Sequence, residues 1–364
     1  VVAEFIKKGF YVDDAGRSAR TIAKLEEIID GLGPAMGKYG FKIKHILRSY
    51  QANVSTGSTS TDSVEIILGL LWSFLDDTLL PNFKVYLGKK RRGEHLDPIL
   101  DLEVLAHTTF TMRVVLRAVG CLYDLSGRFL SPVQMKGRSL YSQVAKLTSK
   151  WDQDLKDIDP GLCVKIEEFF EELCELQEKL KPMPRAWIPK EHDLKMLIAS
   201  QDGSIEGYSA TMHVRSQCPT TKSYISNLAT ARNKISQLDV GDNELFSMLL
   251  GGKMAEQTIK SIPDLPEGIP FVHMGDSMCT AHCLNPAHLQ VDRRRRNILV
   301  KLHRVFRRIH CTYPSSDILF VWAEGSENPA DLNSKSHPNL LEIVNGQFWR
   351  NGPPSFSAEE FPPP

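Results

Sequence analysis

The sequence predicts an α+β protein in which a short strand-rich part, a helical part and an α/β part follow one another. Three observations lead to this order. Apolar residues recur at helical spacing between about residues 101 and 181, prolines in KPMPRAWIPK (181–190) then stop the helices, and strand-type runs begin near residue 194. Because these later strands alternate with helical stretches, we expect a mixed sheet covered by helices.

Composition bounds the class of protein. The chain has 364 residues with 44 basic and 44 acidic side chains, so any site for a polyanion must be local. The length suggests two or three domains. Seven scattered cysteines favour a reducing, intracellular compartment, and no apolar run is long enough to span a bilayer. The chain opens directly into an apolar stretch without Met, as expected of an excised fragment.

The N-terminal part combines strand-type runs with one helix. VVAEFIKKGFYVDDAG predicts a hairpin over residues 5–14 with Asp13 and Asp14 at its turn, followed by an amphipathic helix over 19–36. Paired aspartates commonly end a strand, but they can also hold divalent metals for nucleotidyl transfer. In VEIILGLLWSF (64–74), Gly69 predicts a bulge or a close backbone approach within a strand.

Two basic segments have two possible interpretations each. KKRRG contains Lys89, Lys90, Arg91 and Arg92, and DRRRRNILV contains Arg293, Arg294, Arg295 and Arg296. A solvated turn or helix face is the usual explanation for such runs. Beside a nucleic-acid-cleaving centre, the same side chains would contact backbone phosphates with salt-sensitive affinity.

Four carboxylates of the α/β part lie at positions where a structural role or a functional role can be expected. Each of them could serve singly as a cap or turn residue. Together they occupy the end of a first strand, the start of a helix, the end of a later strand and a final loop: Asp202, Glu244, Asp276 and Asp331. We expect them to converge at one sheet edge, where they could bind two Mg²⁺ or Mn²⁺ ions and activate a water molecule.

In their order along the chain, these motifs resemble the reverse transcriptase and RNase H region of BEL/Pao-class LTR retrotransposons. YVDD (11–14) resembles the palm motif, YGFKIKHIL (39–47) the segment after it, and ILGLLWSF (67–74) the primer-grip strand. LRAVGCLYDLSGRF (116–129) resembles the connection segment, PRAWIP (184–189) the entry to the RNase H-like domain, and SENPADLNSK (326–335) its final motif.

The resemblance implies a domain order and a set of roles. It predicts a partial palm in residues 1–100, a helical thumb and connection in 101–190, an RNase H-like α/β domain with a mixed sheet in 191–350, and a disordered Pro-rich tail in 351–364. Asp13 and Asp14 would be remnants of the polymerase site, and Leu68, Gly69 and Trp72 would contact the primer strand. Asp202, Glu244, Asp276 and Asp331 would hydrolyse RNA in RNA–DNA hybrids.

The resemblance also sets expectations about activity and context. Members of this class carry a further palm aspartate upstream of YVDD, so we expect polymerisation by this chain alone to be lost. The expected partners are an RNA–DNA hybrid or template–primer and the upstream part of the same polyprotein, in a cytoplasmic virus-like particle or in the nucleus. The alternative is a remnant of a decayed or domesticated element that binds nucleic acid or assembles without catalysing a reaction.

Overall fold

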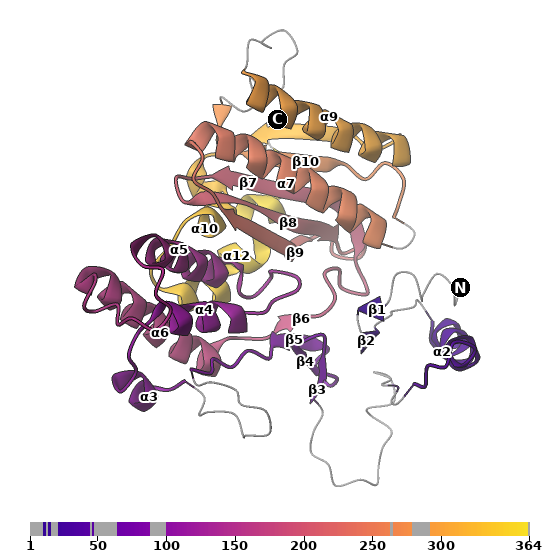
Figure 1. Ribbon diagram of the computed structural model, residues 1–364. Coiled ribbons are helices and arrows are strands. Elements are labelled where there is room, and N and C mark those ends of the chain that lie inside the picture. Colours follow the sequence, from indigo (N-terminus) through magenta and orange to yellow (C-terminus); the bar gives the residue numbers. More distant parts are fainter. Residues whose placement is uncertain are drawn as a thin grey trace. The chain divides into compact units, whose positions relative to one another are not determined.

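The computed structural model divides the chain into two units, Val1–Asn82 and Phe83–Pro364 (Figure 1). It describes residues 10–11, 14–15, 21–43, 46, 64–87, 100–262, 265–278 and 292–362. The helices among these residues are either too short or too polar to cross a membrane.

The first unit contains the expected N-terminal hairpin and helix. Strand β1 (Phe10–Tyr11) pairs antiparallel with β2 (Asp14–Ala15), with Tyr11 opposite Asp14. Asp14 therefore begins the second strand and does not lie in the turn, while Asp13 lies outside the described residues. Helix α2 (Ile22–Gly37) starts where the Thr21 hydroxyl accepts the Lys24 amide at 3.3 Å.

Three short strands follow in the same unit: β3 (Val64–Ile67), β4 (Leu70–Ser73) and β5 (Thr78–Pro81), each antiparallel to the next. The prediction of Gly69 inside a strand is wrong, because Leu68 and Gly69 form the two-residue turn between β3 and β4. Their φ angles are 52° and 76°, as a type I′ hairpin turn requires. The sequence does not indicate this turn, because Gly, Asn or Asp usually occupies a position with positive φ, and position 68 is a leucine.

The second unit begins with four helices, and all but the third have an N-terminus that is capped by a polar side chain. They are α3 (Leu102–Ala106), α4 (Met112–Cys121), α5 (Ser131–Leu147) and α6 (Pro160–Lys179). In α6, most apolar residues of an otherwise acidic helix are buried, although Val164 is exposed, and Phe170 packs edge-to-face against Phe110 at 5.1 Å. The helix ends before Pro182, and a short strand, β6 (Met183–Pro184), follows.

The predicted mixed sheet is present in the second unit. Its five strands lie in the order β11-β10-β7-β8-β9, with β8 and β9 antiparallel to their neighbours and β10 and β11 parallel to β7. Their bounds are β7 (Asp193–Gly203), β8 (Gly207–Gln217), β9 (Tyr224–Ile235), β10 (Phe271–Gly275) and β11 (Ile318–Trp322). Strand β9 lies at the edge of the sheet and is not predicted from the sequence, because Asn, Thr and Arg obscure its alternation of apolar and polar residues.

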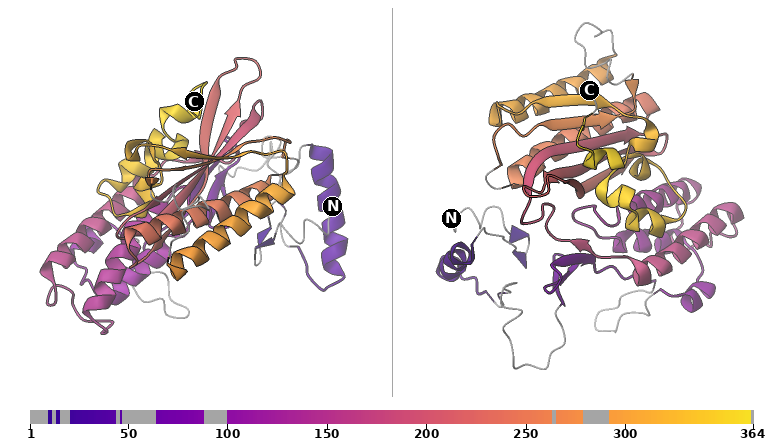
Figure 2. Two further views of the ribbon diagram at one scale, coloured as in Figure 1. Left: turned by 90° about the horizontal axis from the view of Figure 1, so that it is seen from above. Right: turned by 180° about the vertical axis from the view of Figure 1, so that it is seen from behind.

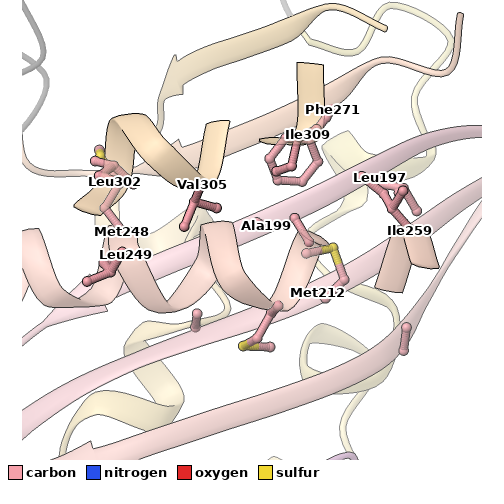
Figure 3. Close-up of a cluster of buried hydrophobic side chains, with 14 of the residues drawn as sticks. Leu197, Ala199, Met212, Met248, Leu249, Ile259, Phe271, Leu302, Val305 and Ile309 are labelled. Carbon is pink, nitrogen blue, oxygen red and sulfur yellow. The ribbon is translucent and has the colours of Figure 1, made fainter. Parts of the chain in front are cut away.

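Helices α7 (Val240–Ser261) and α9 (Arg293–Thr312) cover one face of the sheet (Figure 2). Side chains of β7 alternate between the two faces, so that Leu197 and Ala199 join this core. Figure 3 shows both residues between the sheet and the apolar stripes of the two helices, which include Met248, Leu249, Leu302, Val305 and Ile309.

The C-terminal segment covers the other face of the sheet and corrects a prediction. It contains η3 (Gly325–Glu327), α10 (Asp331–Ser334), α11 (Leu340–Asn345), α12 (Gln347–Asn351) and η4 (Pro354–Ser357). Phe356 and Phe361 pack with Met196 and Ile198 of β7. A disordered tail was predicted from prolines, but within residues 351–362 these two aromatic side chains bury enough apolar surface to fix the chain.

The Phe83–Pro364 unit joins the helices α3–α6 and the sheet in one body. Helix α5 lies beside the edge strand β9, and α6 lies beside α11. The helical segment therefore packs against the α/β part, with the prolines of 182–189 between them in sequence.

Candidate active site

Three of the four predicted carboxylates meet at one edge of the sheet. Oxygen atoms of Asp202, Glu244 and Asp276 all lie within 4.8 Å of one another. The parallel pairing of β7 and β10 explains part of this arrangement: Met274 is opposite Ser200 at the last paired position, and Asp276 and Asp202 each follow two residues later, at the same edge of the sheet. Glu244 comes from the first turns of α7.

Gly203 lets α7 approach the end of β7. A Cβ atom at Gly203 would lie 2.3 Å from the Glu244 amide nitrogen, which no side chain could tolerate. The start of α7 is fixed by the Asp239 carboxylate, which accepts the Asp242 amide at 2.8 Å, and by Asn243, which donates to the Ser204 carbonyl at 2.8 Å. These contacts place Glu244 beside Asp202.

The fourth carboxylate, Asp331, begins α10 and is not part of the group of three. Lys335, one turn later, lies 2.5 Å from an Asp331 oxygen. The preceding Asn328 holds this loop to the sheet, because its side-chain nitrogen donates to the Gln201 carbonyl at 2.9 Å and its oxygen accepts the Ala330 amide at 3.1 Å. Ser209 of β8 adds a bond to the Ala330 carbonyl at 2.7 Å.

Burial and mutual repulsion raise the pKa values of the clustered carboxylates. The pKa of Glu244 rises to about 8, because of burial first and then the charges of Asp202 and Asp276. The pKa of Asp202 rises to about 6, again through burial and then through Asp276 and Asp331. Burial also raises the pKa of Asp276, with a further contribution from Asp331. The site thus concentrates negative charge that a cation would stabilise.

The donor set fits a hard divalent cation. Carboxylate oxygens are the ligands that Mg²⁺ and Mn²⁺ prefer. Moreover, the Oδ1 atom of Asp276 is buried and has no hydrogen-bond partner among the described residues. An unpartnered buried carboxylate oxygen is costly unless it meets a positive charge, so the arrangement suits metal coordination.

The loop after Asp331 contains two further polar side chains with hydrogen-bond partners. The His337 Nε2 atom lies 3.0 Å from the Asp331 carbonyl oxygen, and the Ser336 hydroxyl donates to Glu206 at 2.6 Å. Glu206 and Ser336 also line a groove of about 660 Å³ between α5, α6 and the β7–β8 turn. The three clustered carboxylates do not line this groove.

The predicted basic residues of α9 fall into two groups. Arg294 and Arg295 both bind the buried carboxylate of Asp242, at 3.0 and 2.8 Å. They therefore tie the start of α9 to the start of α7, close in sequence to Glu244. Arg293 and Arg296 are exposed, and their contact with nucleic acid stays a prediction.

Most of the residues predicted to belong to the polymerase part lie outside the described residues. Asp13, Lys89, Lys90, Arg91 and Arg92 lie outside the described residues, as does the side chain of Asp14. Trp72 donates its indole N–H to Asp77 at 3.0 Å across the β4–β5 turn. The roles predicted for Leu68, Gly69 and Trp72 on a primer strand stay predictions.

The sheet order and the acidic cluster define the α/β part as an RNase H-like domain. Residues 111–268 match the family model described as the Pao retrotransposon-like RNaseH-like domain. The match spans α4 to α7, so it includes the helical segment as well as the first strands of the sheet. The predicted relation to Pao-type retrotransposons is confirmed.

Similar solved structures come from nucleic-acid enzymes. The foamy viral protease–reverse transcriptase dRH in complex with double-stranded DNA is 12% identical with a TM-score of 0.42, covering 89% of this chain and 48% of that chain. An N-terminal RNase H domain from Mycobacterium tuberculosis is 11% identical with a TM-score of 0.27, covering 39% and 94%. LC11-RNase H1 in complex with an RNA/DNA hybrid is 12% identical with a TM-score of 0.24, covering 37% and 91%.

The chain thus spans about half the length of the foamy viral protein. A comparison with curated proteins finds no match.

Proposed function

We propose that this chain is a fragment of a retrotransposon reverse transcriptase that hydrolyses the RNA strand of RNA–DNA hybrids. The observation that carries the proposal is the convergence of Asp202, Glu244 and Asp276 within 4.8 Å. The match of residues 111–268 to the model of a retrotransposon RNaseH-like domain supports the choice of substrate.

The carboxylates have distinct positions in the proposed reaction. Asp202, Glu244 and Asp276 would hold Mg²⁺ or Mn²⁺, which supplies charge stabilisation and a more acidic water when bound. Asp331 lies at the margin of the cluster, and the ammonium group of Lys335 at 2.5 Å limits its freedom to rotate. The hydrogen bond from Asn328 to the Gln201 carbonyl of β7 holds the loop before Asp331 in place, and this restricts the positions that the Asp331 carboxylate can occupy.

The basic face of α9 supports a polyanionic substrate. Its sequence, RRRRNILVKLHRVFRRIHCT, contains no acidic residue, and its apolar stripe is buried against the sheet. The opposite face exposes Lys301, Arg304 and Arg307. Because Arg294 and Arg295 bind Asp242, two residues before Glu244 in α7, the start of α9 lies beside the start of α7. We propose that this basic face contacts backbone phosphates of the hybrid.

Cleavage of a labelled RNA–DNA hybrid tests the proposed function. The intact chain is incubated with Mg²⁺ or Mn²⁺ beside Asp202→Asn, which removes one ligand. Asp193→Asn is the matched control, because Asp193 begins the same strand but is exposed, with Lys195 at 3.7 Å. We expect cleavage by the intact chain and by Asp193→Asn, and a loss of about 100-fold or more in Asp202→Asn.

The second candidate function is nucleic-acid binding without hydrolysis. The same experiment separates it from the first when hybrid binding is measured in parallel by fluorescence anisotropy. A folded chain that binds the hybrid but leaves its RNA strand intact in both metals would overturn the hydrolase proposal and favour this alternative.

A further inference from the structure

The helical segment is attached to the sheet through a loop that folds around one buried carboxylate. Asp124 accepts hydrogen bonds through Oδ1 from Ser126 and Gly127 and through Oδ2 from Phe129 and Leu130, with amide nitrogens at 2.7 to 3.1 Å. Such a ring of backbone donors fixes the loop between α4 and α5 in a single conformation.

This loop docks directly on the edge strand β9. The Ser126 carbonyl accepts the Ala231 amide at 3.0 Å and the Thr230 hydroxyl at 2.6 Å. Gly127 has a φ of 71°, and a Cβ atom there would lie 1.9 Å from the Ala231 carbonyl oxygen. The close approach of the loop to β9 therefore requires glycine at this position.

Two asparagines continue the connection from β9 to α10. Asn233 of β9 donates to the Ser131 carbonyl at 2.6 Å, at the start of α5, and to the side-chain oxygen of Asn333 at 2.8 Å. Asn333 in turn donates to the Arg232 carbonyl at 3.1 Å. Asn333 is fully buried and lies in the same short helix as Asp331.

We propose that Asn233 and Asn333 are positioning residues that join the helical segment to the carboxylate site. Through them, the start of α5 and the edge of the sheet fix α10, and thereby the orientation of Asp331 toward the other carboxylates. The inference rests on the proposed function and adds to it that the α4–α5 region is a working part of the hydrolase. This role would explain why the match to the RNaseH-like family model, which covers residues 111–268, starts at α4.

A purely structural role makes a different prediction from a positioning role. A structural bond contributes to the free energy of unfolding wherever it lies. Loss of a positioning bond also lowers the affinity of the carboxylate site for a divalent ion, because a displaced carboxylate attracts the ion less strongly. Substituting groups that orient metal ligands typically costs 10- to 100-fold in affinity. Asn233 acts one step further away, so we expect about 10-fold.

Mn²⁺ binding to the full chain, measured by electron paramagnetic resonance, separates the two roles. The test variant is Asn233→Ala, with Asn233→Ser as a second variant that keeps a polar group on the edge strand should the first not fold. Asn351→Ala is the matched control. Asn351 also ties a C-terminal helix to β9, through the Ser226 carbonyl at 2.8 Å and Asn227 at 3.0 Å, at the other end of the strand.

We expect the Mn²⁺ dissociation constant to rise about 10-fold in the Asn233 variants. In Asn351→Ala it should stay at the value of the intact chain, although the melting temperature falls. Unchanged Mn²⁺ affinity in folded Asn233 variants would overturn the positioning role. An intact chain that binds Mn²⁺ without cleaving a hybrid would refute only the proposed function, whereas an intact chain that binds no Mn²⁺ would refute both.

Discussion

Gly203 and Glu244 are in contact through their backbones: a Cβ atom at position 203 would lie 2.3 Å from the amide nitrogen of Glu244. The end of β7 and the first turn of α7 thus approach as closely as two backbones can. This contact brings a carboxylate from the helix to one from the strand, and it makes a small residue necessary where the site is built.

Gly203→Ala should push α7 away from β7 and separate Glu244 from Asp202. We expect a destabilisation of about 1 to 3 kcal/mol from overpacking, together with weaker Mn²⁺ binding. Gly120→Ala in α4 is the control, because a Cβ atom there meets nothing within 4 Å. It should leave Mn²⁺ affinity unchanged and increase stability by about 0.5 to 1 kcal/mol. Equal Mn²⁺ affinities in the two variants would contradict this role of Gly203.

The metal-free protein should lose stability as pH rises from about 6.5 to 8. Folding raises the pKa of Asp202 from 3.8 to about 6 and that of Glu244 from 4.5 to about 8. Below about pH 6.5 the resulting excess of protons in the folded state is offset by the buried His213 and His273, because burial lowers their pKa values from 6.5 to about 4 and about 3. Above pH 6.5 both histidines are neutral in the folded and unfolded states while Glu244 still holds its proton, so the free energy of unfolding should fall between pH 6.5 and 8 by about 2 kcal/mol.

Urea unfolding in EDTA at pH 5, 6.5 and 8 measures this dependence. Glu244→Gln carries no ionisable group at position 244, so its stability should fall less than that of the intact chain above pH 6. Added Mg²⁺ should restore stability at pH 8, where the carboxylates are most ready to bind it. A metal-free stability that stays constant or rises from pH 6.5 to 8 would be inconsistent with the crowded carboxylate site.

Asn328→Ala should loosen the loop that carries Asp331. The substitution removes the bond to the Gln201 carbonyl and the bond from the Ala330 amide, both inside a fully buried site. We expect a loss of about 1 to 3 kcal/mol in stability and a weaker affinity for Mn²⁺. Asn345→Ala breaks comparable bonds to the backbones of Lys179 and Lys181, away from the carboxylates. Asn345→Ala should lower the free energy of unfolding without changing Mn²⁺ affinity. A reduced Mn²⁺ affinity in Asn345→Ala would show that the effect of Asn328→Ala is not specific to the loop of Asp331.

The basic face of α9 should govern the salt dependence of hybrid binding. A triple variant with Lys301, Arg304 and Arg307 changed to Ala removes exposed charge without touching the buried stripe of the helix. Each phosphate contact contributes about 0.9 to the slope of log K against log salt concentration, so we expect the slope to decrease by about 2 to 3. Lys179→Ala on α6 should leave it unchanged. An unaltered slope in the triple variant would show that the hybrid does not contact this face of α9.

The sequence predicts the carboxylate site better than it predicts the structure around it. Asp202 and Asp276 follow strand-type runs, and because parallel strands end at the same edge, their convergence could be expected without coordinates. The bond between Asn233 and Asn333 joins residues a hundred positions apart, and no local pattern marks it. The prediction of a disordered tail rested on its prolines, which are typical of disorder. Phe356 and Phe361 are buried against the sheet instead, and they determine the structure of the tail.

The central claim is tested most directly by the rate of RNA cleavage in a hybrid as Mg²⁺ or Mn²⁺ is titrated into the intact chain and into Asp202→Asn. The account predicts a metal-dependent rate in the intact chain that saturates, and a rate near background in Asp202→Asn at every metal concentration. A cleavage rate that is the same in both proteins, or the absence of metal-dependent cleavage by a folded intact chain, would contradict it.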